Sequence, residues 1–137
     1  MSWLQNNTMT IFAILLALFF FRNHILSRVL GVGEMSVHDL STQLASKQPP
    51  VLIDVRTQPE FNGGHVKQAI LVPLSDLGAR MEGLKKNYEG REIAVICRSG
   101  NRSLGGSVTL KRAGFDKVYN VSGGMLHWLS QGYPVAK

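Results

Sequence analysis

A short apolar segment that ends at the chain's only cysteine constrains the fold more than any other feature. Residues 93–96 (Ile-Ala-Val-Ile) predict a buried parallel strand, because the segment is apolar and rich in β-branched side chains. Cys97 follows directly, and residues 102–112 predict a helix that closes at Gly114. The thiol is therefore expected at the carboxyl end of a strand, where a loop enters the N-terminus of a helix.

This position favours chemistry at the thiol. Open α/β sheets bind ligands at the carboxyl ends of their strands, where backbone N–H groups and the helix dipole favour an anion. The same field lowers the pKa of a thiol, so Cys97 is expected to be largely thiolate near neutral pH. Arg98 and Arg102 suit an anionic substrate, and Gly100 lets the backbone approach a ligand closely. The alternative, an inert buried cysteine that ends a strand, leaves both arginines unexplained.

The rest of the domain alternates between strand-like and helix-like segments. Strands are predicted at residues 51–55, 70–72 and 117–121. Helices are predicted from Ser36 through residue 47, and from Ser75 through Leu84, with a solvated turn at residues 85–90. The alternation predicts an α/β fold with a parallel sheet, right-handed crossovers and helices on both faces.

The first part of the chain is apolar enough to predict a membrane-spanning helix. Residues 9–21 are almost wholly apolar, and counting from Trp3 gives 19 residues, or about 28 Å at ~1.5 Å per residue. That length is close to the ~30 Å hydrocarbon core, so residues 3–21 are expected to contact the lipid bilayer. Trp3 would lie at one interface, and Arg22, Asn23 and His24 at the other.

The charges beside this segment predict its orientation. Arg22 and Arg28 follow the apolar run and no charged side chain precedes them, so the positive-inside rule predicts an outer N-terminus and a cytoplasmic catalytic domain, in a bacterial inner membrane. Residues 25–30 keep a helical apolar spacing and predict a short helix at the membrane surface. Two alternatives are a cleavable signal peptide and a segment 12–21 that packs on its own domain or in an oligomer.

Length and composition indicate one domain with an appendage. We expect residues 1–33 to form the anchor and a juxtamembrane hinge at residues 31–33, and residues 34–137 to form the catalytic domain. One cysteine excludes an internal disulfide and a multi-cysteine zinc site, and no other metal-binding constellation is present in the sequence. The chain has 15 Lys and Arg against 9 Asp and Glu, but the basic residues are scattered, so no nucleic-acid binding is expected.

Four motifs in order resemble one known family. The active segment follows a Cys-x-x-Gly-x-Arg-Ser pattern and resembles the active loop of the rhodanese sulfurtransferases in their single-domain form. The other matching segments are Asp54-Val55-Arg56 with Glu60-Phe61, Gly64-His65-Val66 leading to residues 69–74, and Gly123-Gly124-Met125 with Trp128 and residues 132–135. The resemblance covers roughly residues 35–135. It departs from the family at Gln68, where glycine is usual, and at Gly105-Gly106, where small alanines are usual.

The resemblance implies a sulfurtransferase that uses no cofactor except a covalent persulfide on Cys97. In the family this cysteine takes the outer sulfur of a donor such as thiosulfate, releases sulfite, and passes the sulfur to cyanide or a thiol acceptor. The residues expected to bind the substrate are Arg98, Ser99, Gly100, Asn101, Arg102 and Ser103. For Arg102, pairing with Asp54 or Glu60 is slightly favoured over contact with an anion.

Four further residues are expected to support the active loop rather than to react: Asp54, Arg56, Glu60 and His65. His65 fits a role in tying loops together better than the role of a base. A membrane anchor also implies a partner or delivery site at the bilayer.

Two other functions stay open at this level. The first is a cysteine-dependent phosphatase, since some phosphatases share the fold, but their loops have five residues between Cys and Arg. Only four residues intervene between Cys97 and Arg102. The second is a membrane-tethered binding or scaffold module, which in this family is marked by loss of the cysteine.

Overall fold

One five-stranded parallel sheet organises the domain in the computed structural model, which describes residues 2–137. The order across the sheet is β1-β5-β4-β2-β3, and all four neighbouring pairs are parallel. The strands are β1 (Gly33–Met35), β2 (Val51–Asp54), β3 (Ile70–Leu71), β4 (Ile93–Ile96) and β5 (Val118–Val121). The predicted α/β fold with a parallel sheet is confirmed.

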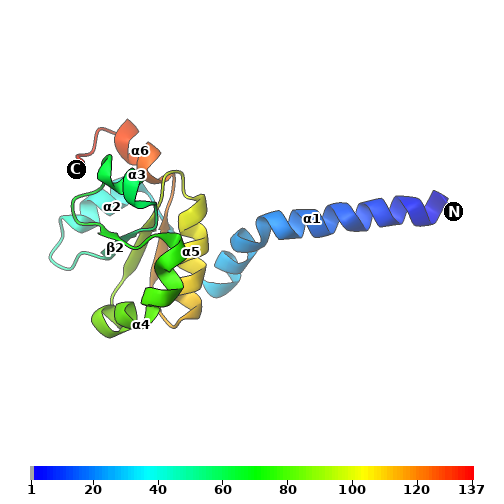
Figure 1. Cartoon of the computed structure of the whole chain (residues 1–137), viewed down its shortest axis with the longest axis horizontal. Coiled ribbons are helices and arrows are strands. Elements are labelled where there is room, and N and C mark those ends of the chain that lie inside the picture. The colour runs from blue at the N-terminus through cyan, green and yellow to red at the C-terminus, as the bar shows by residue number, and fades with distance from the viewer. Residues whose placement is uncertain (1) are drawn as a thin grey trace.

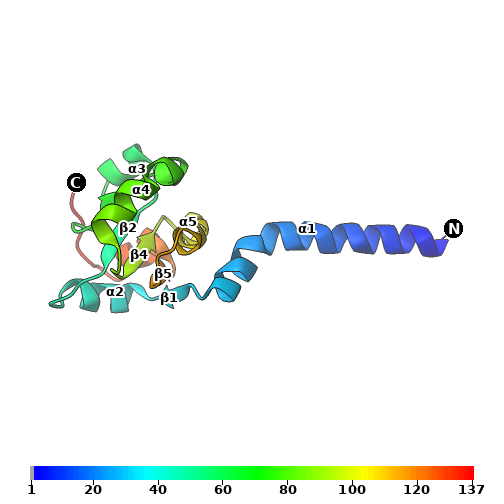
Figure 2. The same ribbon diagram turned by 90° about the horizontal axis from the view of Figure 1, so that it is seen from below.

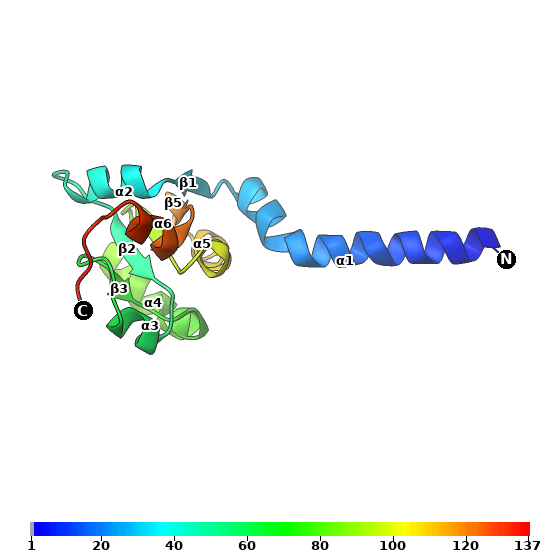
Figure 3. The same ribbon diagram turned by 90° about the horizontal axis from the view of Figure 1, so that it is seen from above.

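Helices cover both faces of this sheet, as predicted (Figure 1). The helices of the domain are α2 (Val37–Leu44), α3 (Gln58–Asn62), α4 (Leu77–Tyr88), α5 (Asn101–Arg112) and α6 (Gly124–Ser130), with a 3-10 turn at Leu74–Asp76. Leu77 and Leu84 of α4 and Leu110 of α5 pack on one face, and Leu40 and Leu44 of α2 pack on the other with α6. Figures 2 and 3 show α4 and α2 on opposite sides of the strands.

The central strands β2 and β4 are apolar except for Asp54, because both of their faces are buried. Val51 and Ile53 point to the α4 and α5 side, while Leu52 between them points to the α2 and α6 side. Val95 and Ile96 divide between the two faces in the same way. This double burial explains why β2 and β4 could be predicted to within one residue.

Two helix predictions need correction. Helix α4 continues to Tyr88 through the segment predicted as a turn at 85–90, because Lys85 and Lys86 lie on its exposed face. Ser75 does not cap this helix. It lies in the preceding 3-10 turn, and Asp76 occupies the N-cap position of α4 instead. The predicted cap at Ser36 is confirmed, since its Oγ accepts a hydrogen bond from the Asp39 N–H at 3.0 Å, but α2 ends at Leu44 rather than at residue 47.

Three short elements were not predicted: β1, α3 and α6. Strand β1 starts at Gly33, within the segment expected to be a hinge, and pairs with β5 through Gly33 and Tyr119. A Cβ added to Gly33 would lie 2.6 Å from Cδ1 of the Tyr119 ring, so only glycine fits at this pairing.

The N-terminal apolar segment forms α1 (Ser2–Leu30), which projects from the domain (Figures 1 and 2). The part from Asn7 to Leu30 is long and apolar enough to cross a membrane, with a mean hydropathy of 1.9. The side chains of residues 12–21 are all exposed, so the alternative in which this segment packs on its own domain is wrong. The residues expected to form a separate short helix, 25–30, continue α1 instead.

The last turns of α1 bend toward α5 and pack on it (Figure 3). Asn23, Leu26, Ser27 and Leu30 are covered, and their spacing places them on one face of the helix. The Asn23 amide lies over Gly105, where an added Cβ would be 3.3 Å from its Nδ2. Gly105, which departs from the family pattern, therefore allows α1 to approach α5 closely.

Only two residues connect α1 to the sheet. The Val32 N–H donates to the Ser27 carbonyl at 2.8 Å and the Gly31 N–H to the Arg28 carbonyl at 3.3 Å, with Gly31 at φ +80°. These bonds form a Schellman motif, which satisfies the carbonyls at the helix end. Strand β1 begins at the next residue, so Gly31 and Val32 are the whole connection between helix and sheet.

Candidate active site

The Cys97 thiol lies at the carboxyl end of β4, as predicted, and is almost completely buried at 1% exposure. The Gly100 N–H donates to Sγ at 3.0 Å, and the Ser103 Oγ lies 3.2 Å from Sγ. Burial raises the pKa of Cys97, but hydrogen bonds with the Ser103 side chain and with backbone N–H groups of Ser103, Gly100 and Ser99 outweigh it. The net pKa lies below the ordinary value, in the direction expected from the sequence.

Gly100 shapes the loop that surrounds the thiol. Its φ is +105°, a conformation that side chains rarely adopt, and it turns the loop so that its N–H points at the sulfur. A Cβ added there would lie 3.4 Å from the Gly123 nitrogen. Of the other loop residues expected to bind substrate, Arg98, Ser99 and Asn101 are exposed around the buried thiol. Within residues 2–137 the Arg98 guanidinium forms no ion pair.

Helix α6 supports the same loop from the other side. The Met125 N–H donates to the Cys97 carbonyl at 2.9 Å, and the Leu126 N–H donates to the Arg98 carbonyl at 3.0 Å. Gly124, at φ +54°, is so close that an added Cβ would overlap the Cys97 carbonyl oxygen. The Gly123-Gly124 motif in the sequence thus serves close backbone approach between α6 and the active loop.

A buried ion pair lies at the end of the neighbouring strand β2. The Arg56 Nη2 and Nε donate to the Asp54 carboxylate at 2.8 and 3.1 Å, and both side chains are buried. Arg56 also donates to the carbonyls of Glu60 at 3.3 Å and Gly64 at 2.9 Å. It therefore joins β2 to the middle of α3 and to the segment that follows this helix, which agrees with the expected supporting role.

A second ion pair joins α3 to the active helix. Arg102 binds Glu60 through both terminal nitrogens, each at 2.7 Å, so the slightly favoured pairing with a carboxylate is the one observed. Asp54 is not its partner because Arg56 already occupies that carboxylate. The Arg102 guanidinium lowers the pKa of Glu60 to about 2, and Glu60 in turn raises the pKa of Arg102. Contact between Arg102 and a substrate stays a prediction.

His65 ties two loops together and has no contact with the thiol. Its Nδ1 lies 2.8 Å from the Phe61 carbonyl oxygen, and its ring stacks on the Phe61 ring at 3.6 Å between centroids. Its backbone pairs with Ala136 near the C-terminus. The geometry agrees with the structural interpretation of His65.

Two polar residues in the surroundings of the thiol, Asn120 and Glu34, were not predicted from the sequence, whereas Ser103 was. The Ser103 hydroxyl donates to Asn120 Oδ1 at 2.5 Å, and Asn120 Nδ2 donates to the Gly100 carbonyl at 3.3 Å. Nδ2 also faces both oxygens of Glu34 at 3.3 and 3.4 Å. A buried asparagine within the predicted strand 117–121 was the available signal, because a polar group at such a position needs hydrogen-bond partners.

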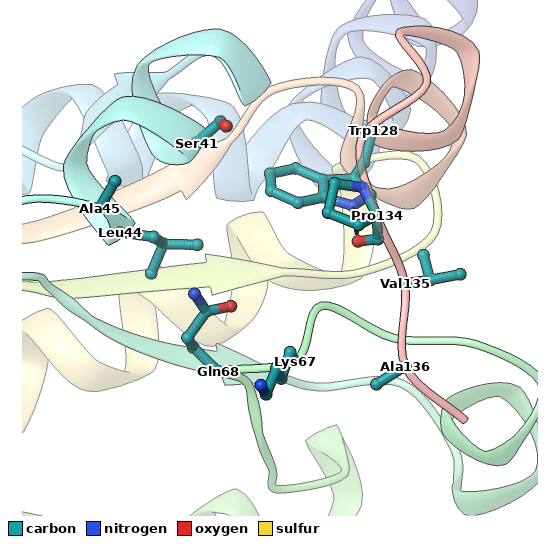
Figure 4. A pocket seen from close by; sticks show the side chains of 9 residues that line it. All are labelled: Ser41, Leu44, Ala45, Lys67, Gln68, Trp128, Pro134, Val135 and Ala136. Carbon is teal, nitrogen blue, oxygen red and sulfur yellow. Dashed lines mark hydrogen bonds between the residues drawn. The ribbon is translucent and has the colours of Figure 1, made fainter.

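A separate hollow of about 230 Å³ lies away from the thiol (Figure 4). Lys67 and Gln68 lie on one side of it, and Ser41 and Leu44 of α2 with the adjoining Ala45 on the other. The segment 134–136 and Trp128 close it. Gln68, the other departure from the family pattern, therefore lines this hollow and not the active loop.

Comparison with known proteins identifies the family to which the domain is similar. The model of the family described as rhodanese-like domain matches residues 36–131. A sulfurtransferase of Allochromatium vinosum is 32% identical over 104 residues, which cover 76% of this chain and 94% of that protein. Thiosulfate sulfurtransferase 18 of Arabidopsis thaliana is 38% identical over 94 residues, covering 61% of this chain and 69% of that protein. A rhodanese-related protein from Thermoplasma volcanium has a crystal structure that superposes with a TM-score of 0.67 at 30% identity, covering 76% of this chain and 97% of that one.

Proposed function

The chain belongs to the rhodanese-like domain family and is similar to two proteins named as sulfurtransferases, and from this premise we propose that it transfers sulfane sulfur through a persulfide on Cys97. The observation that carries the proposal is the cradle around Sγ, which includes the Gly100 N–H at 3.0 Å and the Ser103 hydroxyl at 3.2 Å. The Gly100 N–H donor stabilises a negatively charged sulfur, and the Ser103 hydroxyl does so when it turns its proton toward Sγ.

The proposed reaction has two steps and balances without an external oxidant. The Cys97 thiolate attacks the outer sulfur of thiosulfate, the bond between the two thiosulfate sulfurs breaks, and sulfite leaves with the electron pair. An acceptor, cyanide or a thiolate, then attacks the outer sulfur of the persulfide and releases the Cys97 thiolate again. Dividing the transfer in this way predicts ping-pong kinetics. Thiosulfate is proposed as donor because a relative carries that activity in its name.

Arg98 is the residue proposed to meet the anionic donor. It is exposed on the loop directly after the nucleophile, while Arg102 is held by Glu60. A cation at the opening of the site attracts anions and does so less at high salt. We also propose that the exposed N–H groups of the loop take the donor oxygens, in the manner of an anion-binding nest.

The loop favours sulfur transfer over the phosphatase alternative. Only four residues separate Cys97 from Arg102, and the Arg102 guanidinium points to Glu60, where it forms two 2.7 Å bonds. The phosphatase loop has five residues between its cysteine and arginine, which makes a larger cradle suited to a phosphate. The scaffold alternative requires no reactive thiol, and Cys97 has a pKa below its ordinary value.

We propose that α1 tethers this activity to a membrane, with the domain on the cytoplasmic side of a bacterial inner membrane. The exposed apolar side chains of residues 9–21 support the tether, and Arg22 and Arg28 beside the domain support the orientation. An anchored enzyme also implies a membrane-protein partner or a delivery site at the bilayer.

The decisive experiment measures sulfur transfer from thiosulfate to cyanide by the full chain in detergent, beside a Cys97→Ala variant of equal unfolding midpoint. We expect turnover that requires Cys97, and a mass gain of one sulfur atom on Cys97 after thiosulfate alone. Absence of both the turnover and the mass gain would overturn the proposal and favour the scaffold module. The tether is tested separately, by whether the chain stays with membranes after an alkaline carbonate wash.

A further inference from the structure

We propose that Asn120, oriented by Glu34, is a positioning residue that holds the single proton of the Ser103 hydroxyl away from Cys97 and so sets the reactivity of the sulfur. The inference deepens the proposed function. Its consequence for sulfur transfer rests on that function, whereas the effect of Asn120 on the reactivity of Cys97 does not. It starts from three side chains that form a continuous path from the sulfur to the edge strand β1: Ser103, Asn120 and Glu34.

The first step is a count of protons. The Ser103 Oγ lies 3.2 Å from the Cys97 Sγ and 2.5 Å from the Asn120 Oδ1. A hydroxyl has one proton to donate, while an amide oxygen has none. The 2.5 Å contact is therefore a hydrogen bond only when Ser103 donates to Asn120. In that arrangement Ser103 can accept the S–H proton of a Cys97 thiol, but it cannot donate to a thiolate.

The second step concerns the orientation of the amide. Asn120 Nδ2 faces the two oxygens of Glu34, at 3.3 and 3.4 Å, and the Gly100 carbonyl oxygen at 3.3 Å. All three are acceptors. Turning the amide over would put Oδ1 against them, so the nitrogen must stay on that side and the oxygen must face Ser103. Glu34 is itself fixed by the Ser122 hydroxyl, which donates to it at 2.6 Å.

The third step follows the charge on the sulfur. When Cys97 is a thiolate, the Ser103 proton is drawn toward it, but only by giving up the bond to Asn120. Asn120 thus competes with the sulfur for one proton, which makes the thiolate less populated and, once formed, less shielded by hydrogen bonds. We infer that removal of the Asn120 oxygen frees Ser103 for the sulfur and lowers the pKa of Cys97.

Other ionisable groups lie around the thiol, of which Arg102 interacts with it electrostatically, and all of them must stay constant in the test. They lie on the loop and on every element around it: Arg98, Arg102, Asp54, Glu60, Glu34 and His127. The first experiment leaves all of them unchanged.

The experiment measures the rate of Cys97 alkylation by iodoacetamide against pH, in the full chain in detergent, where Cys97 is the only cysteine. Asn120→Leu removes the competing oxygen at similar size, and we expect the midpoint of the profile to move to lower pH. Below the midpoint the rate should rise by about a factor of three to ten, which corresponds to half a pKa unit to one unit. Ser103→Ala should move the midpoint to higher pH, and the double variant should match Ser103→Ala alone.

A purely structural role predicts the opposite sign. Loss of the Asn120 bond to the Gly100 carbonyl would loosen the loop, weaken the Gly100 N–H bond to sulfur and raise the midpoint. A raised or unchanged midpoint in Asn120→Leu, or a double variant that follows Asn120→Leu, would overturn the proposal.

Glu34→Gln provides a second route in case Asn120→Leu does not fold, because Glu34 is exposed on an edge strand. It replaces the Glu34 carboxylate, one of the two groups that orient the amide, with an amide that can donate as well as accept; this weakens the preference for the observed orientation, and we expect the midpoint to fall. Part of that fall comes simply from the lost negative charge, and this part persists in a Ser103→Ala background. The fall must therefore be larger with Ser103 present, and equal falls in both backgrounds would contradict the proposal. Alkylation does not require sulfur transfer, so a failed transfer assay and a failed profile are separate results.

Discussion

The two sides of the active loop are held by different kinds of contact. On the side of β2 and α3, two ion pairs connect four charged residues: Asp54, Arg56, Glu60 and Arg102. We call this the arginine side. On the side of β1 and β5, hydrogen bonds connect Ser103, Asn120 and Glu34, of which only Glu34 is charged. We call this the amide side. The arginine side has no hydrogen bond to Sγ, while the amide side reaches it through Ser103.

This difference suggests that one side sets the shape of the active loop and the other the reactivity of Cys97. Arginine binds a carboxylate through several nitrogens in a fixed geometry, so the arginine side is expected to fix the shape of the loop. On the amide side, the Ser103 proton can be shared between Asn120 and the sulfur, with which Ser103 is in direct contact. Substitutions on the arginine side should therefore change stability most, and those on the amide side should change the pH dependence of Cys97.

The largest effect is expected from Arg56→Met. It leaves the Asp54 carboxylate buried without its partner, which costs about 3–5 kcal/mol of unfolding free energy. Urea unfolding followed by circular dichroism measures the loss. The matched control is Arg112→Met, at an exposed position of α5, where we expect a change within about 0.5 kcal/mol. Similar losses in both variants would contradict the structural importance of the arginine side.

Gly124→Ala tests the support from α6 that is common to both sides. The residue has φ +54° and an added Cβ would overlap the Cys97 carbonyl oxygen, so we expect about 1–3 kcal/mol of destabilisation and a displaced loop. Slower alkylation of Cys97 in the folded variant would show the displacement. Gly78→Ala, where nothing lies within 4 Å of the added Cβ, should alter neither the alkylation rate nor the loop.

Glu60→Gln tests the exposed part of the arginine side through pH. Arg102 lowers the pKa of Glu60 from 4.5 to about 2, so its contribution to stability is complete above pH 4.5 and is lost as the pH falls toward 2. Because the pair is partly exposed, the contribution is about 1 kcal/mol or less. Thermal unfolding of wild type and variant should differ at neutral pH and converge between pH 4.5 and 2. A constant difference across this range would contradict the assignment.

The smallest effect is expected where α1 rests on α5, on the outer surface of the active helix. Gly→Ala inside a helix stabilises by about 0.5–1 kcal/mol when space allows. Gly83→Ala in α4, with nothing within 4 Å, should show that gain, whereas Gly105→Ala must displace the Asn23 amide, 3.3 Å from its Cβ, and should show less. Equal gains in urea unfolding would mean that the contact with α1 does not restrict this position.

The sequence predicted the sheet better than it predicted the surroundings of the thiol. The strand-forming runs are apolar on both faces, so composition alone located β2, β4 and β5. Strand β1 has three residues and α3 has five, and neither is long enough for a periodic pattern to appear.

The two sides of the loop differ in the same respect. Pairing of Arg102 with a carboxylate was predictable from charge type, and the occupied Asp54 explains why Glu60 is the partner. The contacts of Asn120 were not predictable, because its partners Ser103 and Glu34 lie 17 and 86 residues away and no charge complementarity marks them. Only the folded sheet, with β1 beside β5, brings them together.

The two-residue connection between α1 and β1 also determines where the site can reach. A flexible linker of about 20 residues would let a domain sweep a radius of about 25 Å around its anchor. With only Gly31 and Val32 between helix and strand, and α1 packed on α5, the proposed membrane-bound enzyme cannot sweep. The carboxyl edge of its sheet, where Cys97 lies, faces one direction relative to the anchor. Encounters with an acceptor therefore depend on lateral diffusion and on rotation of the whole molecule about the membrane normal. An acceptor anchored in the same bilayer at a matching height would meet the sulfur far more often than its bulk concentration suggests.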